Sequence, residues 1–167
     1  MARFLYSKPV AATRLPCSLP DTVFLPHQGL PGMGSPIKYM NVIRYFRDAR
    51  PRTTETTSNP TWKQVESAIR KMDNYCFPIV QLGCRDPDDD DESFNVIGGN
   101  GRLALFHFMA DWQYEDDSGD MTETRLWESD QGYFCHECNV IKDIELALRV
   151  TRRYYDTGSY NELDAIR

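Results

Sequence analysis

The residue types best suited to metal or nucleophilic chemistry gather in one short run, Cys135-His136-Glu137-Cys138. Two thiolates at this spacing can occupy two corners of a tetrahedral zinc site. A structural zinc site needs four ligands, however, and the sequence holds no second C-x-x-C pair. A zinc-dependent nucleobase deaminase would also need a proline before the first cysteine, where this chain has Phe134. We therefore expect buried thiols at the end of a strand, with no metal and no cofactor.

A glycine-rich run, Gly98-Gly99-Asn100-Gly101-Arg102, is the second candidate for chemistry. A phosphate-binding loop needs a helix after the glycines, because the N–H groups of the helix N-terminus face the anion. Here the apolar residues 103–109 follow, and they are typical of a strand. The sequence therefore predicts a β-hairpin with residues of positive φ in its turn, and no nucleotide site.

Carboxylates gather in two further runs. The first has six acids in seven positions, and the second has four in six; they are Asp86, Asp88, Asp89, Asp90, Asp91 and Glu92, and Glu115, Asp116, Asp117 and Asp120. A calcium loop would need a glycine at its sixth position and a distal glutamate, which the first run lacks. Both runs are either solvated loops or an electrostatic docking surface for a basic partner.

The charge is distributed unevenly along the chain. Residues 1–60 hold eight Lys and Arg against three acids, whereas residues 61–167 hold 11 basic residues against 22 acids. A surface of this kind repels duplex nucleic acid, whose binding needs clustered Lys and Arg. It attracts a basic protein and speeds the encounter with it.

No catalytic constellation is recognisable in the sequence, so we expect a protein that is not an enzyme. The three histidines stand apart: His27 in a proline-rich stretch, His107 in an apolar run and His136 beside Cys135. The alternative is a small metal-binding module or enzyme that uses Cys135, His136 and Cys138. An adaptor with a proline-rich ligand arm is a third possibility, although the arm has no P-x-x-P pair.

The elements that must position these residues can be read from prolines and periodicity. Eight of the ten prolines lie in the first 60 residues, which predicts an extended arm over residues 1–36 and a folded domain over residues 37–167. The pattern predicts a strand over 37–46 and a Thr/Ser-rich loop over 51–60. It then predicts a helix over about 62–72 that begins at a capping box formed by Thr61 and Gln64. Further strands are expected over 77–82, 94–97, 103–109, 124–127 and 133–135, with a last helix over about 141–157.

This order predicts an α+β fold: an antiparallel sheet packed with two main helices and preceded by the proline-rich arm. No stretch is apolar enough to span a membrane, and the first nine residues lack the apolar segment of a signal peptide. We therefore expect no membrane partner, a cytoplasmic location and reduced cysteines. A monomer is the favoured oligomeric state.

Three pieces of the chain carry a resemblance to a known family. They are the helix with Trp62, Val65, Ala68, Ile69 and Met72 that precedes the strand Ile79-Val80-Gln81-Leu82; the strand and turn Phe94-Asn95-Val96-Ile97-Gly98-Gly99-Asn100-Gly101-Arg102; and Val140-Ile141 before a helix that ends Tyr154-Tyr155-Asp156-Thr157-Gly158. In this order, over about residues 37–160, the chain resembles the immunity-protein family of bacterial polymorphic toxin systems, whose members usually sit beside deaminase-type toxins.

The resemblance implies a non-enzymatic antitoxin that binds a cognate toxin domain and occludes its active site. The toxin is expected to be a nucleic-acid-targeting deaminase with a basic surface, and the immunity protein itself is expected to bind no nucleic acid. The two acidic runs are the first candidates for the contact with the toxin. Asn100 and Arg102 in the glycine-rich hairpin are the second.

Overall fold

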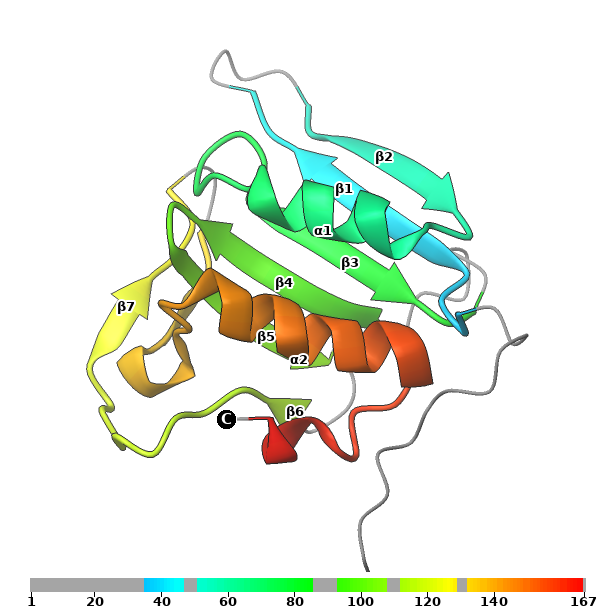
Figure 1. The fold of residues 1–167 in the computed structure, drawn as a ribbon. Helices are drawn as coiled ribbons and strands as arrows, with labels where there is room; N and C mark the ends of the chain where they lie inside the picture. Colours follow the sequence, from blue (N-terminus) through cyan, green and yellow to red (C-terminus); the bar gives the residue numbers. More distant parts are fainter. Residues whose placement is uncertain (1–34, 47–50, 86–92, 108–111, 129–131, 167) are drawn as a thin grey trace, which may run out of the picture. The chain divides into compact units, whose positions relative to one another are not determined.

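The chain folds as an α+β domain around an antiparallel sheet (Figure 1). The computed structural model describes residues 35–46, 51–85, 93–107, 112–128 and 132–166. Six strands follow the spatial order β2-β1-β3-β4-β5-β6. They are β1 (Tyr39–Arg44), β2 (Thr53–Ser58), β3 (Ile79–Gly83), β4 (Ser93–Gly99), β5 (Arg102–His107) and β6 (Trp112–Gln113). A separate two-stranded sheet pairs β7 (Glu123–Arg125) with β8 (Phe134–His136).

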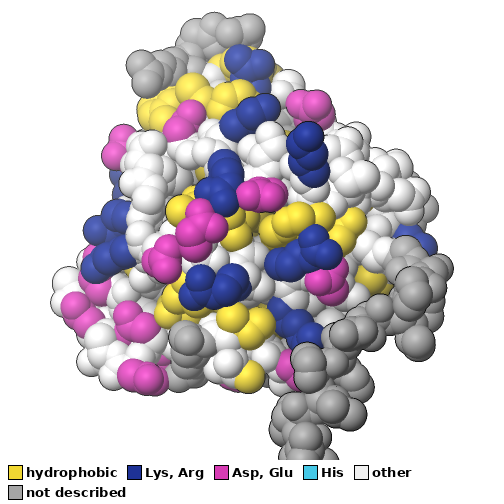
Figure 2. Space-filling view, viewed as in Figure 1, with side chains coloured by type: hydrophobic (Ala, Val, Ile, Leu, Met, Phe, Trp, Pro, Cys, Tyr) yellow, Lys and Arg dark blue, Asp and Glu magenta, His cyan; other side chains and the backbone are white. Residues whose placement is uncertain are grey.

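Two helices, α1 (Trp62–Arg70) and α2 (Ile144–Thr157), cover one face of the six-stranded sheet. Acidic and basic side chains are interspersed over this side of the molecule (Figure 2). Beneath the helices lies the main apolar core, to which alternate residues of the strands contribute, among them Val80, Val96 and Leu105. The other face buries Ile43, Ile79 and Ile97 in a smaller cluster. Because both faces are covered, every residue of β4 is buried.

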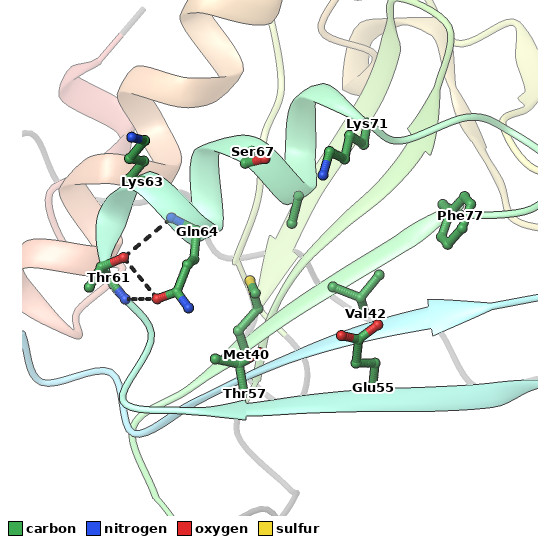
Figure 3. Close-up of a pocket in the computed structure, with 11 residues that line it drawn as sticks. Met40, Val42, Glu55, Thr57, Thr61, Lys63, Gln64, Ser67, Lys71 and Phe77 are labelled. Carbon is green, nitrogen blue, oxygen red and sulfur yellow. Dashed lines mark hydrogen bonds between the residues drawn. The ribbon is translucent and has the colours of Figure 1, made fainter.

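Helix α1 is short and begins at a capping box, as the sequence predicts. The backbone N–H of Thr61 donates to Oε1 of Gln64 at 2.8 Å, and the Thr61 hydroxyl accepts from the Gln64 backbone N–H (Figure 3). A helix of nine residues is marginal by itself, because its nucleation cost is spread over few hydrogen bonds. It is held in place by burial of Val65 and Ile69, and each buried side chain contributes about 1.5–3 kcal/mol.

Replacing Thr61 with alanine should lower the free energy of unfolding by about 1 kcal/mol, because the first turn loses its cap. Urea denaturation measures the change. Ser67→Ala, in the middle of the same helix, is the control and should change stability by less than about 0.5 kcal/mol. Equal losses in the two variants would contradict a role for the cap.

Helix α2 begins three residues later than the pattern predicts. Asp143 is its N-cap and accepts a hydrogen bond from the Glu145 backbone N–H at 2.9 Å. The apolar residue Ile141, which the sequence assigns to the helix, pairs instead with Leu103 in an isolated β-bridge. The C-terminal prediction is confirmed, since Gly158 has φ +64° and donates its N–H to the Tyr154 carbonyl.

The loop predicted over residues 51–60 is wrong, because Thr53–Ser58 forms strand β2 and pairs with β1 along its whole length. Threonine is β-branched and favours an extended backbone. The strand lies at the edge of the sheet and is exposed almost throughout, so it lacks the apolar alternation that marks a half-buried strand. Its composition is typical of a loop, although its pairing makes it a strand.

The β4–β5 hairpin is confirmed, with a turn shorter than the sequence predicts. Gly98 and Gly99 belong to β4, and only Asn100 and Gly101 form the turn, with φ of +53° and +80°.

The two-residue strand β6 has no counterpart among the predicted elements, and β7 and β8 belong to the separate two-stranded sheet. The arm expected over residues 1–36 lies, but for its last two residues, outside the described residues. No helix of the described ranges is long and apolar enough to cross a membrane.

Candidate protein-binding surface

The second acidic run belongs to an exposed stretch between β6 and β7, here called the acidic segment (residues 115–123). It carries five carboxylates and no Lys or Arg in nine residues. None of Glu115, Asp116 and Asp120 takes part in an ion pair among the described residues. Their negative charge is therefore not neutralised within the described part of the chain.

Backbone hydrogen bonds attach the acidic segment to the 3-10 turn η1 (Glu137–Asn139). Asp116 N–H donates to the Cys138 carbonyl at 2.8 Å, Cys138 N–H donates to the Asp120 carbonyl at 3.0 Å, and Glu137 N–H donates to the Thr122 carbonyl at 2.9 Å. The buried Asn139 adds a side-chain bond from Nδ2 to the Tyr114 carbonyl at 3.0 Å. The segment is thus held at both ends and along its length.

Side chains within the acidic segment close successive turns. Asp116 Oδ1 accepts from the Ser118 N–H at 2.9 Å, and Asp120 Oδ1 accepts from the Thr122 N–H at 3.0 Å. The hydrogen bonds from Thr122 lower the pKa of Asp120, so this carboxylate stays ionised at neutral pH. An array of this kind presents fixed negative charge, whereas a solvated loop would present the same charge in many arrangements.

Two large apolar side chains are exposed, one in the acidic segment and one on the strand that pairs with β7. Met121 lies inside the acidic segment with 62% of its surface exposed, and Phe134 on β8 has 55% exposed. The register of the small sheet pairs Phe134 with Arg125, whose guanidinium carbon stands 5.7 Å from the Phe134 ring centroid. Carboxylates beside exposed apolar side chains are the mixture expected of a protein-binding surface.

An ionic cluster behind the acidic segment joins η1 to the hairpin. The Glu137 carboxylate accepts from the Arg102 guanidinium and lies 3.1 Å from Lys142 Nζ. Arg102 also donates to Thr124 Oγ1 at 2.8 Å. The hydrogen bonds from Arg102, and then from Lys142, lower the pKa of Glu137 to about 2 from its ordinary 4.5.

This shift predicts a pH dependence of stability. Because the folded-state pKa of Glu137 is depressed, its contribution is complete above pH 4.5 and is lost as the pH falls toward about 2. Glu137→Gln should therefore lower stability at pH 6 and flatten the pH profile between about 5 and 2. Urea midpoints across this range measure both effects, with Glu55→Gln on β2 as the control for loss of a carboxylate. A Glu137→Gln profile parallel to that of the wild type would contradict the assignment.

Asn100 and Arg102, the two hairpin residues predicted to bind a partner, both form side-chain hydrogen bonds within the chain. Asn100 Nδ2 donates to Asn74 Oδ1 at 2.7 Å, and Arg102 bonds to Glu137 and Thr124. Asn100 is exposed nonetheless, so its part in partner binding stays a prediction, as does that of Arg102. The first acidic run, Asp86–Glu92, lies outside the described residues. The structure therefore brings the second acidic run together with Met121 and Asn139, which the sequence analysis does not single out, and with Glu137, which it names only beside the two cysteines.

The cysteines of the alternative hypothesis lie in an environment that keeps them protonated. Cys135 packs beside Leu126 and Val140, and burial, with a smaller effect of Glu137, raises its pKa to about 11. Cys138 is buried, and burial followed by the nearby Glu115 raises its pKa too. Zinc ligation and nucleophilic attack both use the thiolate. Among the described residues, no three His, Cys, Asp or Glu side chains gather as a metal site would require.

Two hollows lie elsewhere on the molecule and have linings of a different kind. A groove of about 560 Å³ runs between α1 and strands β1 and β2, with Glu55 as its one carboxylate and no His or Cys (Figure 3). A second, of about 480 Å³, lies along α1 and α2, where Arg70 pairs with Glu145 and Arg152 pairs with Asp156. The first is lined by one carboxylate and two lysines, whereas the arginines and carboxylates named in the second are held in ion pairs.

Comparison with known proteins adds no relative to this description: no family model, no curated protein and no solved structure matches the chain.

Proposed function

We propose that this chain is an immunity protein: a non-enzymatic antitoxin that binds a cognate toxin domain in the cytoplasm and occludes its active site. The toxin is a polymorphic toxin domain with a basic surface, in the first instance a nucleic-acid-targeting deaminase. The observation that carries the proposal is the acidic segment, which backbone hydrogen bonds hold against η1 and which contains the exposed Met121.

Physical complementarity supports this proposal. A toxin that acts on nucleic acid needs Lys and Arg along its substrate groove. A rigid array of carboxylates can occupy such a groove in place of phosphates, and it accelerates association through long-range attraction. An exposed apolar side chain within the same segment, Met121, supplies the desolvated anchor that gives a slow dissociation rate.

Co-expression with the toxin-like C-terminal domain encoded beside this chain tests the proposal. We expect the two proteins to co-purify and the host cells to survive, whereas cells with the toxin domain alone should die. Absence of a complex and of protection would contradict the proposal.

Met121→Arg tests the site itself, because it places a cation in the array opposite a basic partner. It should abolish protection without unfolding the chain. Thr53→Arg, on the sheet edge far from the acidic segment, is the matched control and should protect as the wild type does. Protection by both variants would remove the acidic segment from the interface.

The second candidate, a metal-binding module or enzyme built on Cys135, His136 and Cys138, predicts stoichiometric zinc in protein purified without chelators. The raised pKa of Cys135 argues against this alternative. Zinc at one equivalent, lost together with function in Cys135→Ser, would favour it over the antitoxin.

A further inference from the structure

The two edges of the six-stranded sheet are very different. One edge ends on β6, which has only two residues. The other ends on β2, whose six residues TTETTS contain no Pro, Lys or Arg. Natural proteins usually protect a long edge with such residues, with a bulge or with a short final strand. Glu55 is the only charged residue of β2.

The hydrogen-bond pattern shows which backbone groups of β2 face outward. The register of β1 and β2 pairs Met40 with Thr57 and Val42 with Glu55. Asn59 N–H donates to the Lys38 carbonyl on the β2 side, and Tyr45 N–H donates to the Cys76 carbonyl on the β3 side. The backbone N–H and C=O groups of successive residues in a strand point to opposite neighbouring strands. The even-numbered residues of β1 therefore form their hydrogen bonds with β2.

It follows that residues 53, 55 and 57 of β2 point their backbone groups toward β1. The N–H and C=O groups of Thr54, Thr56 and Ser58 point away from the sheet. No strand of the described residues pairs with this edge. The three residues form a ladder ready to accept another extended strand.

We propose that the occupant of this edge is the β2 strand of a second copy of the chain, paired antiparallel about a two-fold axis at Thr56. In this register Thr56 faces Thr56 of the partner subunit, and Thr54 faces Ser58 of the partner subunit. The two sheets then continue into one another. The state is a dimer, in place of the monomer that the sequence analysis expects.

Electrostatic repulsion favours this register over the register whose two-fold axis lies at Glu55. A two-fold axis at Glu55 would place two carboxylates directly opposite each other, which is destabilising. With the axis at Thr56, Glu55 faces Thr57 of the partner subunit. The side chains of Glu55 and Thr57 line the same groove as Lys63, so each Glu55 approaches the end of the groove where the partner subunit's Lys63 lies (Figure 3).

Light scattering coupled to size-exclusion chromatography of the full chain tests the dimer. The expected mass is twice 19.3 kDa, falling on dilution. Thr54→Pro removes an outward N–H and leaves the ladder to β1 intact, so it should give the monomer mass with an unchanged circular dichroism spectrum. Thr54→Val keeps that N–H and should remain dimeric. A monomer mass at every concentration, or a dimer that Thr54→Pro does not weaken, would overturn the proposal.

Disulfide trapping tests the register without a destabilising variant. Facing residues of a hydrogen-bonded antiparallel pair have Cα atoms about 5.5 Å apart, within the range of a disulfide. Thr56→Cys should therefore cross-link two chains on mild oxidation. Thr54→Cys is the matched control and should not, because the two copies of residue 54 lie far apart in this register. Equal cross-linking of both variants, or of Thr54→Cys alone, would overturn the two-fold axis at Thr56.

Discussion

Alanine at position 99 is expected to cost roughly 4 kcal/mol of the free energy of unfolding, a large part of the 5–15 kcal/mol that holds a domain folded. Gly99 has φ +148°, a backbone conformation essentially confined to glycine. A Cβ there would stand 2.6 Å from the backbone nitrogen of Asn74 and closer still to Asp73. These are backbone atoms, so no side-chain rotation can relieve the overlap.

The loop that would have to move is itself tightly held. Asp73 Oδ1 accepts from the N–H groups of Tyr75 at 2.9 Å and Phe77 at 3.1 Å, and the Asn74 carbonyl accepts from Glu128 N–H at 2.9 Å. Urea denaturation of Gly99→Ala measures the loss. Gly101→Ala is the matched control, because its Cβ meets open space and only its positive φ costs about 1–2 kcal/mol. Similar losses of unfolding free energy in the two variants would contradict the close contact between Gly99 and the backbone of Asp73 and Asn74.

Neutralising the acidic segment is expected to slow association with the proposed toxin partner by roughly 10- to 100-fold at low salt. The variant is Glu115→Gln, Asp117→Asn and Glu123→Gln combined, which leaves the turn-closing carboxylates of Asp116 and Asp120 in place. The association rate should also lose most of its dependence on ionic strength, because the attraction that salt screens is gone. Stopped-flow or surface-plasmon measurements over a range of salt concentrations give both quantities.

A control with the same change in net charge separates the site from the general charge of the chain. Glu55→Gln, Asp156→Asn and Glu162→Gln together remove three carboxylates far from the acidic segment in the sequence. Two of them, Asp156 and Glu162, form exposed pairs with Arg152 and Arg153, which contribute little to stability. This variant should associate nearly as fast as the wild type. If both triple variants slow association equally, the attraction arises from overall charge and the acidic segment has no special part.

Local signals in the sequence were sufficient for some elements and misleading for others. The capping box at Thr61 and the turn at Asn100 and Gly101 depend on residues within a few positions of each other, and the structure confirms both. Strand β2 depends on β1, and its threonines carry no apolar period because both of its faces are exposed. Ile141 was misassigned for the same reason, since only its contact with the distant Leu103 makes it part of a bridge.

The candidate site shows the same division between local and long-range information. The carboxylates of the acidic segment are evident from composition alone. Their fixed arrangement arises from bonds to Cys138 and Asn139, which are about 20 residues away in the chain, and no spacing rule indicates such bonds. Met121 is the local signal that could have indicated a binding surface in the sequence. A large apolar residue among carboxylates is unusual in a purely solvated loop.

The order of the strands has a consequence for stoichiometry. Strand β2 ends one side of the sheet, whereas β6, from which the acidic segment follows, ends the other. A dimer joined through β2 therefore carries its two proposed toxin-binding surfaces on opposite ends of a twelve-stranded sheet, where neither obstructs the other. Each dimer would take up two toxin molecules in a two-to-two complex with equal and independent affinities. A titration of the dimer would then end at one toxin per chain with a single affinity and no cooperativity.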